Sequence, residues 1–209
     1  MSETVAETSF AWTGEGDPKG YDVLWNPLVK TLDTLPTSVP KRIFDLGSGN
    51  GITAELLSRH GWDVTGVEPS DDGLAIARKR APQCRFEKGS AYDDLASRFG
   101  RFPVVMSFEV IEHCYYVNHF ARTFCDLIEP GGIGILTTPF HGYWKNLVLA
   151  LTNHFDAHWS PGTDGGHIKF FSRATLAAVL NEAGLSNLQF STIGRIPPLA
   201  MSHFVICRK

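Results

Sequence analysis

The sequence predicts an α/β fold built on a doubly wound sheet. From residue 42 onward, short runs of β-branched and apolar residues alternate with amphipathic stretches of helical length, which is the pattern of parallel strands joined by crossover helices. The 209 residues correspond to one domain, because a domain usually takes about 100 to 200 residues. A hydrophobic fraction of 43% and a charged fraction of 20% are typical of a globular chain and exclude collagen-like or disordered architecture.

Each element is expected from its local pattern of side chains. The expected strands lie at 42–46, 63–68, 84–88, 104–108, 133–138, 188–193 and 204–207. The expected helices between them lie at 51–60, 71–80, 116–128 and 173–183. The last helix has Ser172 as its N-cap and ends at Gly184, in keeping with the preferences of helix ends. Seven strands with interleaved helices predict the doubly wound sheet.

Two segments fall outside this alternation. Residues 1–40 precede the first strand, and within them 21–35 reads as a helix whose leucines recur at helical spacing, so we expect an N-terminal helical cap over one edge. Residues 140–171 separate the fifth strand from the next helix by 32 positions, far more than such a connection needs. Because this insertion carries seven aromatic residues and four of the eight histidines, we expect it to serve the functional site.

Charge and targeting signals exclude several classes of protein. A net charge of -3 and a pI near 6.2 give no general attraction to nucleic acid, and Arg78, Lys79 and Arg80 form the only basic run that stands out. The four cysteines are scattered without metal-site or disulfide spacing. The N-terminus lacks the pattern of a signal peptide, and no run is apolar enough to span a membrane. We therefore expect a cytoplasmic protein.

The strongest functional signal is Asp45-Leu46-Gly47-Ser48-Gly49-Asn50-Gly51, directly between a predicted strand and a predicted helix. Glycines there allow a tight turn close to a ligand, and the following helix offers free N–H groups. A nicotinamide dinucleotide fingerprint requires glycine where this chain has Ile52, which argues against an oxidoreductase. The acidic residue ahead of the glycines favours a cationic ligand. The alternative is a glycine turn that binds nothing.

Glu68 ends the second predicted strand, 21 positions after Gly47. An acidic residue at this distance accepts the hydroxyl groups of a ribose. Alone the residue is a weak signal, since surface glutamates at strand ends are common. Together with the glycine turn, it predicts a site for one adenosine-shaped ligand.

From about Lys41 to the C-terminus, the chain resembles the class I S-adenosylmethionine-dependent methyltransferases. The resemblance rests on FDLGSGNG, VTGVEPS, KGSAYDDL, VVMSFEVIEH and LIEPGG followed by ILTTP. It is most similar to the O-methyltransferases of ubiquinone biosynthesis, which share the E-x-x-E-H after the fourth strand and a similar insertion. The resemblance implies S-adenosylmethionine as cofactor and a Rossmann-like sheet in the order 3-2-1-4-5-7-6 with the last strand antiparallel. The implied domain is 41–209, with the insertion or lid at 140–171.

The resemblance also assigns residues to the cofactor. Asp45 and the glycine turn are placed at the methionine portion, Glu68 at the ribose, and Ser90 to Tyr92 at the adenine. The complete implied set is Asp45, Gly47, Ser48, Gly49, Gly51, Glu68, Pro69, Ser70, Ser90, Ala91, Tyr92 and Phe108. Many family members have an acidic residue where this chain has Ser90. Asp93 or a backbone carbonyl is the alternative contact for the adenine amino group.

Glu109, Glu112 and His113 are spaced i, i+3 and i+4, so a helical turn after the strand would project them on one face. Three interpretations stay open. The three side chains hold a divalent cation, for which the resemblance implies magnesium; or His113 is the general base that takes the proton of the acceptor; or Glu112 and His113 only cap a turn.

Further along, GGHIKFFS (165–172) resembles the family segment T-H-x-x-K-x-F, which implies that His167 faces the acceptor. The candidate catalytic residues are therefore His113, Glu109 and His167. Within the insertion, 144–155 is a short apolar helix that acts as a lid, touches a membrane peripherally, or packs on the sheet. His141, His154 and His158 have no recognised ligand spacing, although a zinc cluster is conceivable.

These residues favour methyl transfer to a small acceptor, with an oxygen of an aromatic or lipid-like compound ahead of nitrogen or carbon. A methyltransferase-like binding module without turnover is the main alternative, and a nicotinamide-dependent oxidoreductase is the lesser one. We expect neither nucleic acid nor a membrane span among the partners.

Overall fold

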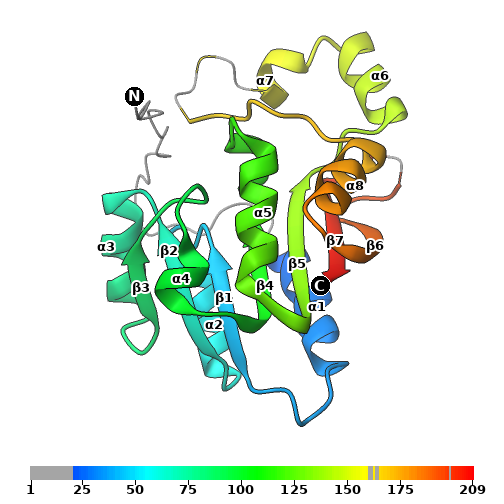
Figure 1. Ribbon diagram of the computed structural model, residues 1–209. Coiled ribbons are helices and arrows are strands. Elements are labelled where there is room, and N and C mark those ends of the chain that lie inside the picture. The colour runs from blue at the N-terminus through cyan, green and yellow to red at the C-terminus, as the bar shows by residue number, and fades with distance from the viewer. Residues whose placement is uncertain (1–20, 160–161, 163–164, 198) are drawn as a thin grey trace, which may run out of the picture.

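A computed structural model describes residues 21–159, 162, 165–197 and 199–209. It contains a seven-stranded sheet in the order β3-β2-β1-β4-β5-β7-β6 (Figure 1). The strands are β1 (Arg42–Leu46), β2 (Asp63–Glu68), β3 (Arg85–Lys88), β4 (Phe102–Phe108), β5 (Ile128–Pro139), β6 (Ser186–Ile193) and β7 (Ser202–Arg208). The first five strands pair in parallel, and β7 runs antiparallel to both β5 and β6. The predicted order and the antiparallel last strand are confirmed.

Helices cover both faces of this sheet. They are α1 (Tyr21–Asp33), α2 (Ile52–Arg59), α3 (Asp71–Arg80), α4 (Leu95–Phe99), α5 (Val117–Leu127), α6 (Tyr143–Leu151), α7 (Phe155–Trp159) and α8 (Arg173–Glu182), with a 3₁₀ turn η1 (Ile111–His113). One apolar cluster joins α4, α5 and α8 to the sheet, and another joins α1, α2 and α3 to it. Neighbouring residues of β1 point to opposite clusters, Phe44 to the first and Ile43 to the second, as pleated strands require.

The predicted helix in the N-terminal segment is α1. Leu24, Leu28 and Leu32 recur at helical spacing and are buried in the cluster shared with α2 and α3. Their positions bring α1 against residues of β4, β5 and β7, such as Met106, Ile135 and Phe204, within one face of the sheet. The rest of the predicted cap, residues 1–20, lies outside the described residues.

The insertion contains two helices where the sequence predicted one over 144–155. Helix α6 ends at Leu151 and α7 begins at Phe155. Asn153 between them has a φ of 54°, a left-handed conformation that ends a helix. In Figure 1 the two helices lie beyond the end of β5 at which the parallel strands finish, so the insertion overhangs the carboxyl edge of the sheet. No helix in the described part of the chain is long and apolar enough to cross a membrane.

Two further differences have local causes. Strand β5 begins at Ile128 instead of 133, because the proline-glycine-glycine segment is absorbed as an irregularity in its pairing with β4, with Gly131 at a φ of 83°. Helix α4 was not predicted because it has only five residues. Its N-cap Asp94 accepts a hydrogen bond from the backbone N–H of Ser97.

Candidate functional site

The turn after β1 depends on glycine for both conformation and space. Gly47, Gly49 and Gly51 have φ values of 86°, 52° and 77°, in the region that side chains rarely adopt. A Cβ on Gly51 would lie 2.8 Å from the backbone Cα of Ala77 in α3. The turn therefore packs directly against α3, and the N-terminus of α2 starts at its last glycine.

Glu68, at the end of β2, ties the two neighbouring turns together. Its Oε2 accepts a hydrogen bond from the N–H of Gly49 at 3.0 Å, and its Oε1 accepts one from the N–H of Ser70 at 3.1 Å. Ser70 in turn caps α3 by accepting from the N–H of Gly73, and Pro69 links the two residues. Glu68 therefore organises both turns.

Asp45, the last residue but one of β1, is a buried acid at the carboxyl edge of the sheet. It is 3% exposed, and burial, with a further contribution from the charge of Glu68, raises the pKa of Asp45 to about 8. Nearby, the hydroxyl of Ser48 is buried and has no hydrogen-bond partner among the described residues. A buried acid that resists ionisation and an unpartnered hydroxyl together suit a cationic, hydrogen-bonding ligand.

The segment expected at the adenine forms a compact turn. Asp93 Oδ2 accepts a hydrogen bond from the N–H of Ser90 at 2.9 Å, and the Ser90 hydroxyl accepts one from the N–H of Tyr92 at 3.1 Å. Ser90 is buried and Ala91 half-buried. Tyr92 lines a hollow of about 770 Å³ together with Tyr116 and residues of α5, whereas the glycine turn and Glu68 do not line it.

The end of β4 carries a conformation that needs explanation. Ser107 donates a hydrogen bond to the carbonyl of Leu46 at 2.7 Å, which fixes this strand end beside the glycine turn, and half-buried Phe108 follows it. Glu109 has a φ of 55°, and its N–H donates to the carbonyl of Thr137 at 3.1 Å. A non-glycine residue in this conformation is a common feature of functional sites.

Glu109 and Glu112 form an acidic pair. Glu109 is exposed by surface area, yet burial by the surrounding protein is the main cause that raises its pKa. Glu112 is fully buried, and its Oε2 accepts a hydrogen bond from the Thr138 hydroxyl at 2.9 Å. Burial and then the charge of Glu109 raise the pKa of Glu112 well above its ordinary value. Burial therefore disfavours the ionised form of both carboxyl groups.

His113 is oriented by the insertion. Its Nδ1 lies 2.7 Å from the carbonyl of Gly165 and 3.2 Å from that of Gly166. Since carbonyls only accept, Nδ1 carries the proton and Nε2 keeps a free lone pair. Burial lowers the pKa of His113, so the ring is neutral at pH 7 and Nε2 can accept a proton.

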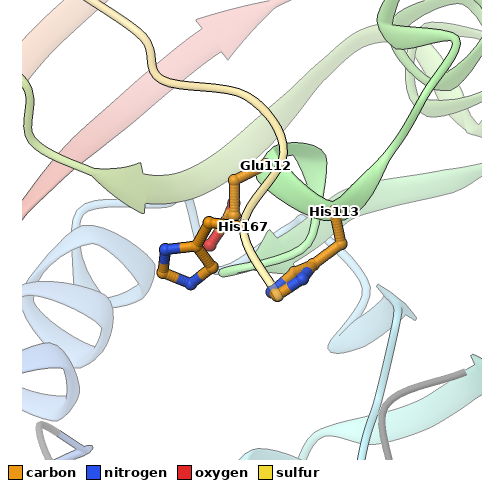
Figure 2. Close-up of side chains that lie close together, drawn as sticks. All are labelled: Glu112, His113 and His167. Atoms are coloured by element: carbon orange, nitrogen blue, oxygen red, sulfur yellow. The ribbon is translucent and has the colours of Figure 1, made fainter. Parts of the chain in front are cut away.

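His167 reaches the same place from the return segment of the insertion. The N–H groups of Ile168 and Lys169 donate to the carbonyl of Glu112 at 2.9 and 3.0 Å, which fastens this segment to η1. The rings of His113 and His167 have centroids 4.9 Å apart. Figure 2 shows the two rings and the Glu112 carboxyl gathered together, and one ligand atom from each lies within 4.8 Å of the others.

The expected set of Glu109, Glu112 and His113 is thus rearranged. The helical turn is a 3₁₀ turn that begins after Glu109, and the metal-competent group consists of Glu112, His113 and His167. Two imidazoles and one carboxylate form a donor set typical of zinc and other transition metals, whereas magnesium prefers oxygen ligands. Glu109 lies outside this group but influences the pKa of Glu112.

Lys145 was missed by the sequence analysis. It is 8% exposed, and its Nζ donates to the carbonyls of Ala200 and Met201 at 3.1 and 3.4 Å. Burial, with a further contribution from Arg195, lowers the pKa of Lys145 to about 8. The sequence contained one indication of this residue, because Lys145 is the single charged residue in the apolar segment WKNLVLAL. A lysine on the inner side of such a helix indicates that the protein around it is polar.

The sheet order, the antiparallel last strand, the glycine turn after β1 and the acid that ends β2 define a Rossmann-like α/β protein of the methyltransferase type. A family profile described as a methyltransferase domain matches residues 24–190. The chain belongs to this methyltransferase domain family.

Similar proteins agree with this placement. A ubiquinone biosynthesis O-methyltransferase of Azorhizobium caulinodans is 32% identical over 68% of this chain and 58% of its own length. One of Caulobacter is 36% identical over 57% of this chain and 49% of its own length. The chain thus spans less than two thirds of these curated relatives. The structure of an O-methyltransferase family protein from Burkholderia thailandensis has a TM-score of 0.67 at 19% identity, over 89% of this chain and 56% of that one, and supports the fold.

Proposed function

We propose that this protein binds S-adenosylmethionine and transfers its methyl group to a small acceptor, at an oxygen of an aromatic or lipid-like compound. The observation that carries the proposal is the joint placement of Asp45, the glycine turn and Glu68 at one edge of the sheet in a member of the methyltransferase domain family. The names of the curated relatives, ubiquinone biosynthesis O-methyltransferases, support oxygen as the methylated atom.

The cofactor would lie across the ends of β1 and β2. Asp45 is suited to its cationic amino group, because a nearby positive charge would stabilise the ionised carboxyl. The unpartnered Ser48 hydroxyl, within the glycine turn, is suited to its polar methionine end, and Glu68 to the ribose hydroxyls. Ser90, Ala91 and Tyr92 would close the adenine end, and Phe108 would lie beside the transferred methyl group.

The cofactor supplies a methyl group that its sulfonium charge already activates, so the chain must align the acceptor, exclude water and accept one proton. His113 is the proposed base. Its Nδ1–H is held by the carbonyl of Gly165, which directs the free lone pair of Nε2, and its lowered pKa keeps that lone pair available. His167 fixes the ring of His113 from the side.

The cofactor assignment is tested by calorimetric titration with S-adenosylhomocysteine, in parallel with NADH. We expect binding of the homocysteine compound alone. Glu68→Gln retains one carbonyl acceptor, whereas Glu68→Ala removes the acceptors of both the turns and the ribose, so we expect at least about tenfold weaker binding for Glu68→Ala and a smaller loss for Glu68→Gln. Glu87→Gln, on the neighbouring strand β3, is the matched control. Unchanged affinity of Glu68→Ala would refute the assignment.

A cation at Glu112, His113 and His167 is a second proposal, independent of the base. Magnesium, the ion implied by the resemblance, suits this donor set less well than zinc or nickel. Activity assayed in excess EDTA, and after addition of each ion, separates the interpretations. If His113 acts as base alone, chelation leaves turnover unchanged while His113→Ala abolishes it. If a cation orients the acceptor, chelation abolishes turnover and one ion restores it.

The outer face of α6 supports a peripheral contact with a membrane. Tyr143, Trp144, Val148 and Leu151 are exposed by 73%, 59%, 42% and 77%, and their spacing gathers them on one side of the helix. The basic residue of the segment, Lys145, faces inward. We therefore propose that the insertion docks through aromatic and apolar contacts, without the basic face that most interfacial helices carry, and that it covers the acceptor site as a lid.

A further inference from the structure

The inner side of the insertion gathers basic side chains. Lys145 and Arg195 repel each other, and the charge of Lys145 also reaches His141, His158 and His167, where it lowers the pKa of each imidazole. Burial is the first cause of each of these shifts. The insertion and Arg195, in the connection between β6 and β7, thus place positive or potentially positive groups around one region.

Lys145 is the centre of this cluster. Two backbone carbonyls, those of Ala200 and Met201, receive hydrogen bonds from its ammonium, and no carboxylate in the described part of the chain forms an ion pair with it. Glu109 is the acid whose charge stabilises its protonated form. An ammonium has three N–H groups, so one remains for a ligand, and a buried cation without an ion-pair partner is costly.

The surrounding side chains also have unused polar atoms. Nε2 of His141, Nε2 of His158 and Nε1 of Trp159 are buried without a hydrogen-bond partner among the described residues. His141 is 5% exposed. Its ring lies 5.3 Å from that of His158 and 4.9 Å from that of Phe170, which in turn lies 4.8 Å from that of Trp159. The Trp159 Nε1 is a donor, whereas His141 Nδ1 donates to Asn146 Oδ1 at 3.3 Å, so Nε2 of that neutral ring is an acceptor. Unpartnered polar atoms and aromatic rings are therefore contiguous, and such atoms in a native protein call for a partner.

We propose that this cluster is a binding subsite for a carboxylate carried by the methyl acceptor, with Lys145 as its charge partner and Phe170 and Trp159 against the adjoining ring or hydrocarbon. The inference rests on the proposed function for the identity of its ligand as an acceptor. One buried ammonium among neutral imidazoles matches a single negative charge, whereas a phosphate dianion would call for further cations or a bidentate arginine. The subsite is a specificity determinant distinct from the proton acceptor His113.

The test uses benzoate and its neutral isostere benzamide as probes, titrated by ligand-observed NMR with and without saturating S-adenosylhomocysteine. We expect benzoate to bind the wild-type protein at least tenfold more tightly than benzamide. Lys145→Met should abolish this preference, Lys145→Arg should retain part of it, and Lys169→Met, which removes a cation held over the ring of Tyr115, should leave it unchanged.

Unchanged binding of S-adenosylhomocysteine and an unchanged near-ultraviolet circular dichroism spectrum would show that Lys145→Met is folded. If that variant unfolds, Lys145→Arg and the wild-type ratio decide the matter. Equal affinities for benzoate and benzamide, no benzoate binding, or a preference that survives Lys145→Met would overturn the subsite. Failure of S-adenosylhomocysteine to bind while the benzoate preference holds would instead overturn the proposed cofactor.

Discussion

Ionisation of Asp45 should couple cofactor binding to release of a proton. Its pKa of about 8 means that about nine tenths of the free protein carries a proton on this carboxyl at pH 7. A bound ammonium group stabilises the ionised form and returns the pKa toward its ordinary value. Because the free state then binds more protons than the complex, affinity should rise with pH, approaching about tenfold per unit below pH 8. About 0.9 proton should leave per cofactor bound at pH 7.

Calorimetry in two buffers of different ionisation enthalpy measures this proton directly. Titrations of S-adenosylhomocysteine between pH 6 and 7 keep the amino group of the ligand protonated, so the released proton belongs to the protein. Asp45→Asn should bind more weakly and release none. The same heat in both buffers for the wild-type protein would refute the reasoning, because it would mean that Asp45 is either already ionised or remote from the ammonium.

Two further predictions concern local packing and the lid. Gly51→Ala should lower the free energy of unfolding, measured in urea, by more than the roughly 1–2 kcal/mol of a left-handed alanine, since its Cβ would meet the backbone of Ala77 at 2.8 Å. Gly61→Ala, with a φ of 81° and only the end of a flexible lysine at 4.0 Å, isolates the conformational cost, and equal losses would contradict the packing argument. Trp144→Ser combined with Leu151→Ser should reduce sedimentation with zwitterionic vesicles by about tenfold or more, because two large apolar side chains lose their burial. Binding that requires anionic lipid and disappears in salt would contradict the apolar mode.

Much of the fold was predictable because its signals are local. β1 and β2 were predicted with the bounds that the structure has, since each is a short buried run ended by a turn. The adjacent parallel pairing of these strands then brings Gly49 and Glu68 together, so the cofactor-side hypothesis followed from two spacings. The break between α6 and α7 was not predictable, because it depends on the left-handed conformation of Asn153, which asparagine adopts only in some contexts.

The acceptor side was less accessible to sequence reasoning, because its residues meet through contacts between distant segments. His167 lies beside His113 because the backbone N–H groups of the next two residues, Ile168 and Lys169, donate to the carbonyl of Glu112. A sequence pattern does not predict these hydrogen bonds between distant segments. Spacing alone grouped Glu109 with Glu112 and His113. The 3₁₀ turn and the insertion instead group His167 with the latter two.

Helix α6 reverses the usual arrangement of a surface helix, and this reversal links its two proposed roles. An ordinary surface helix buries its apolar side and exposes its charges. In α6 the charged Lys145 is buried while Trp144 and Leu151 are largely exposed. Burial of the ammonium is costly unless the interior offers a charge partner, and exposure of the apolar side is costly unless an apolar surface covers it. The buried side of α6 is therefore suited to an anionic group, and its exposed side is suited to a hydrophobic surface. A methyl acceptor that has an acidic head group and enters from a lipid layer would provide both.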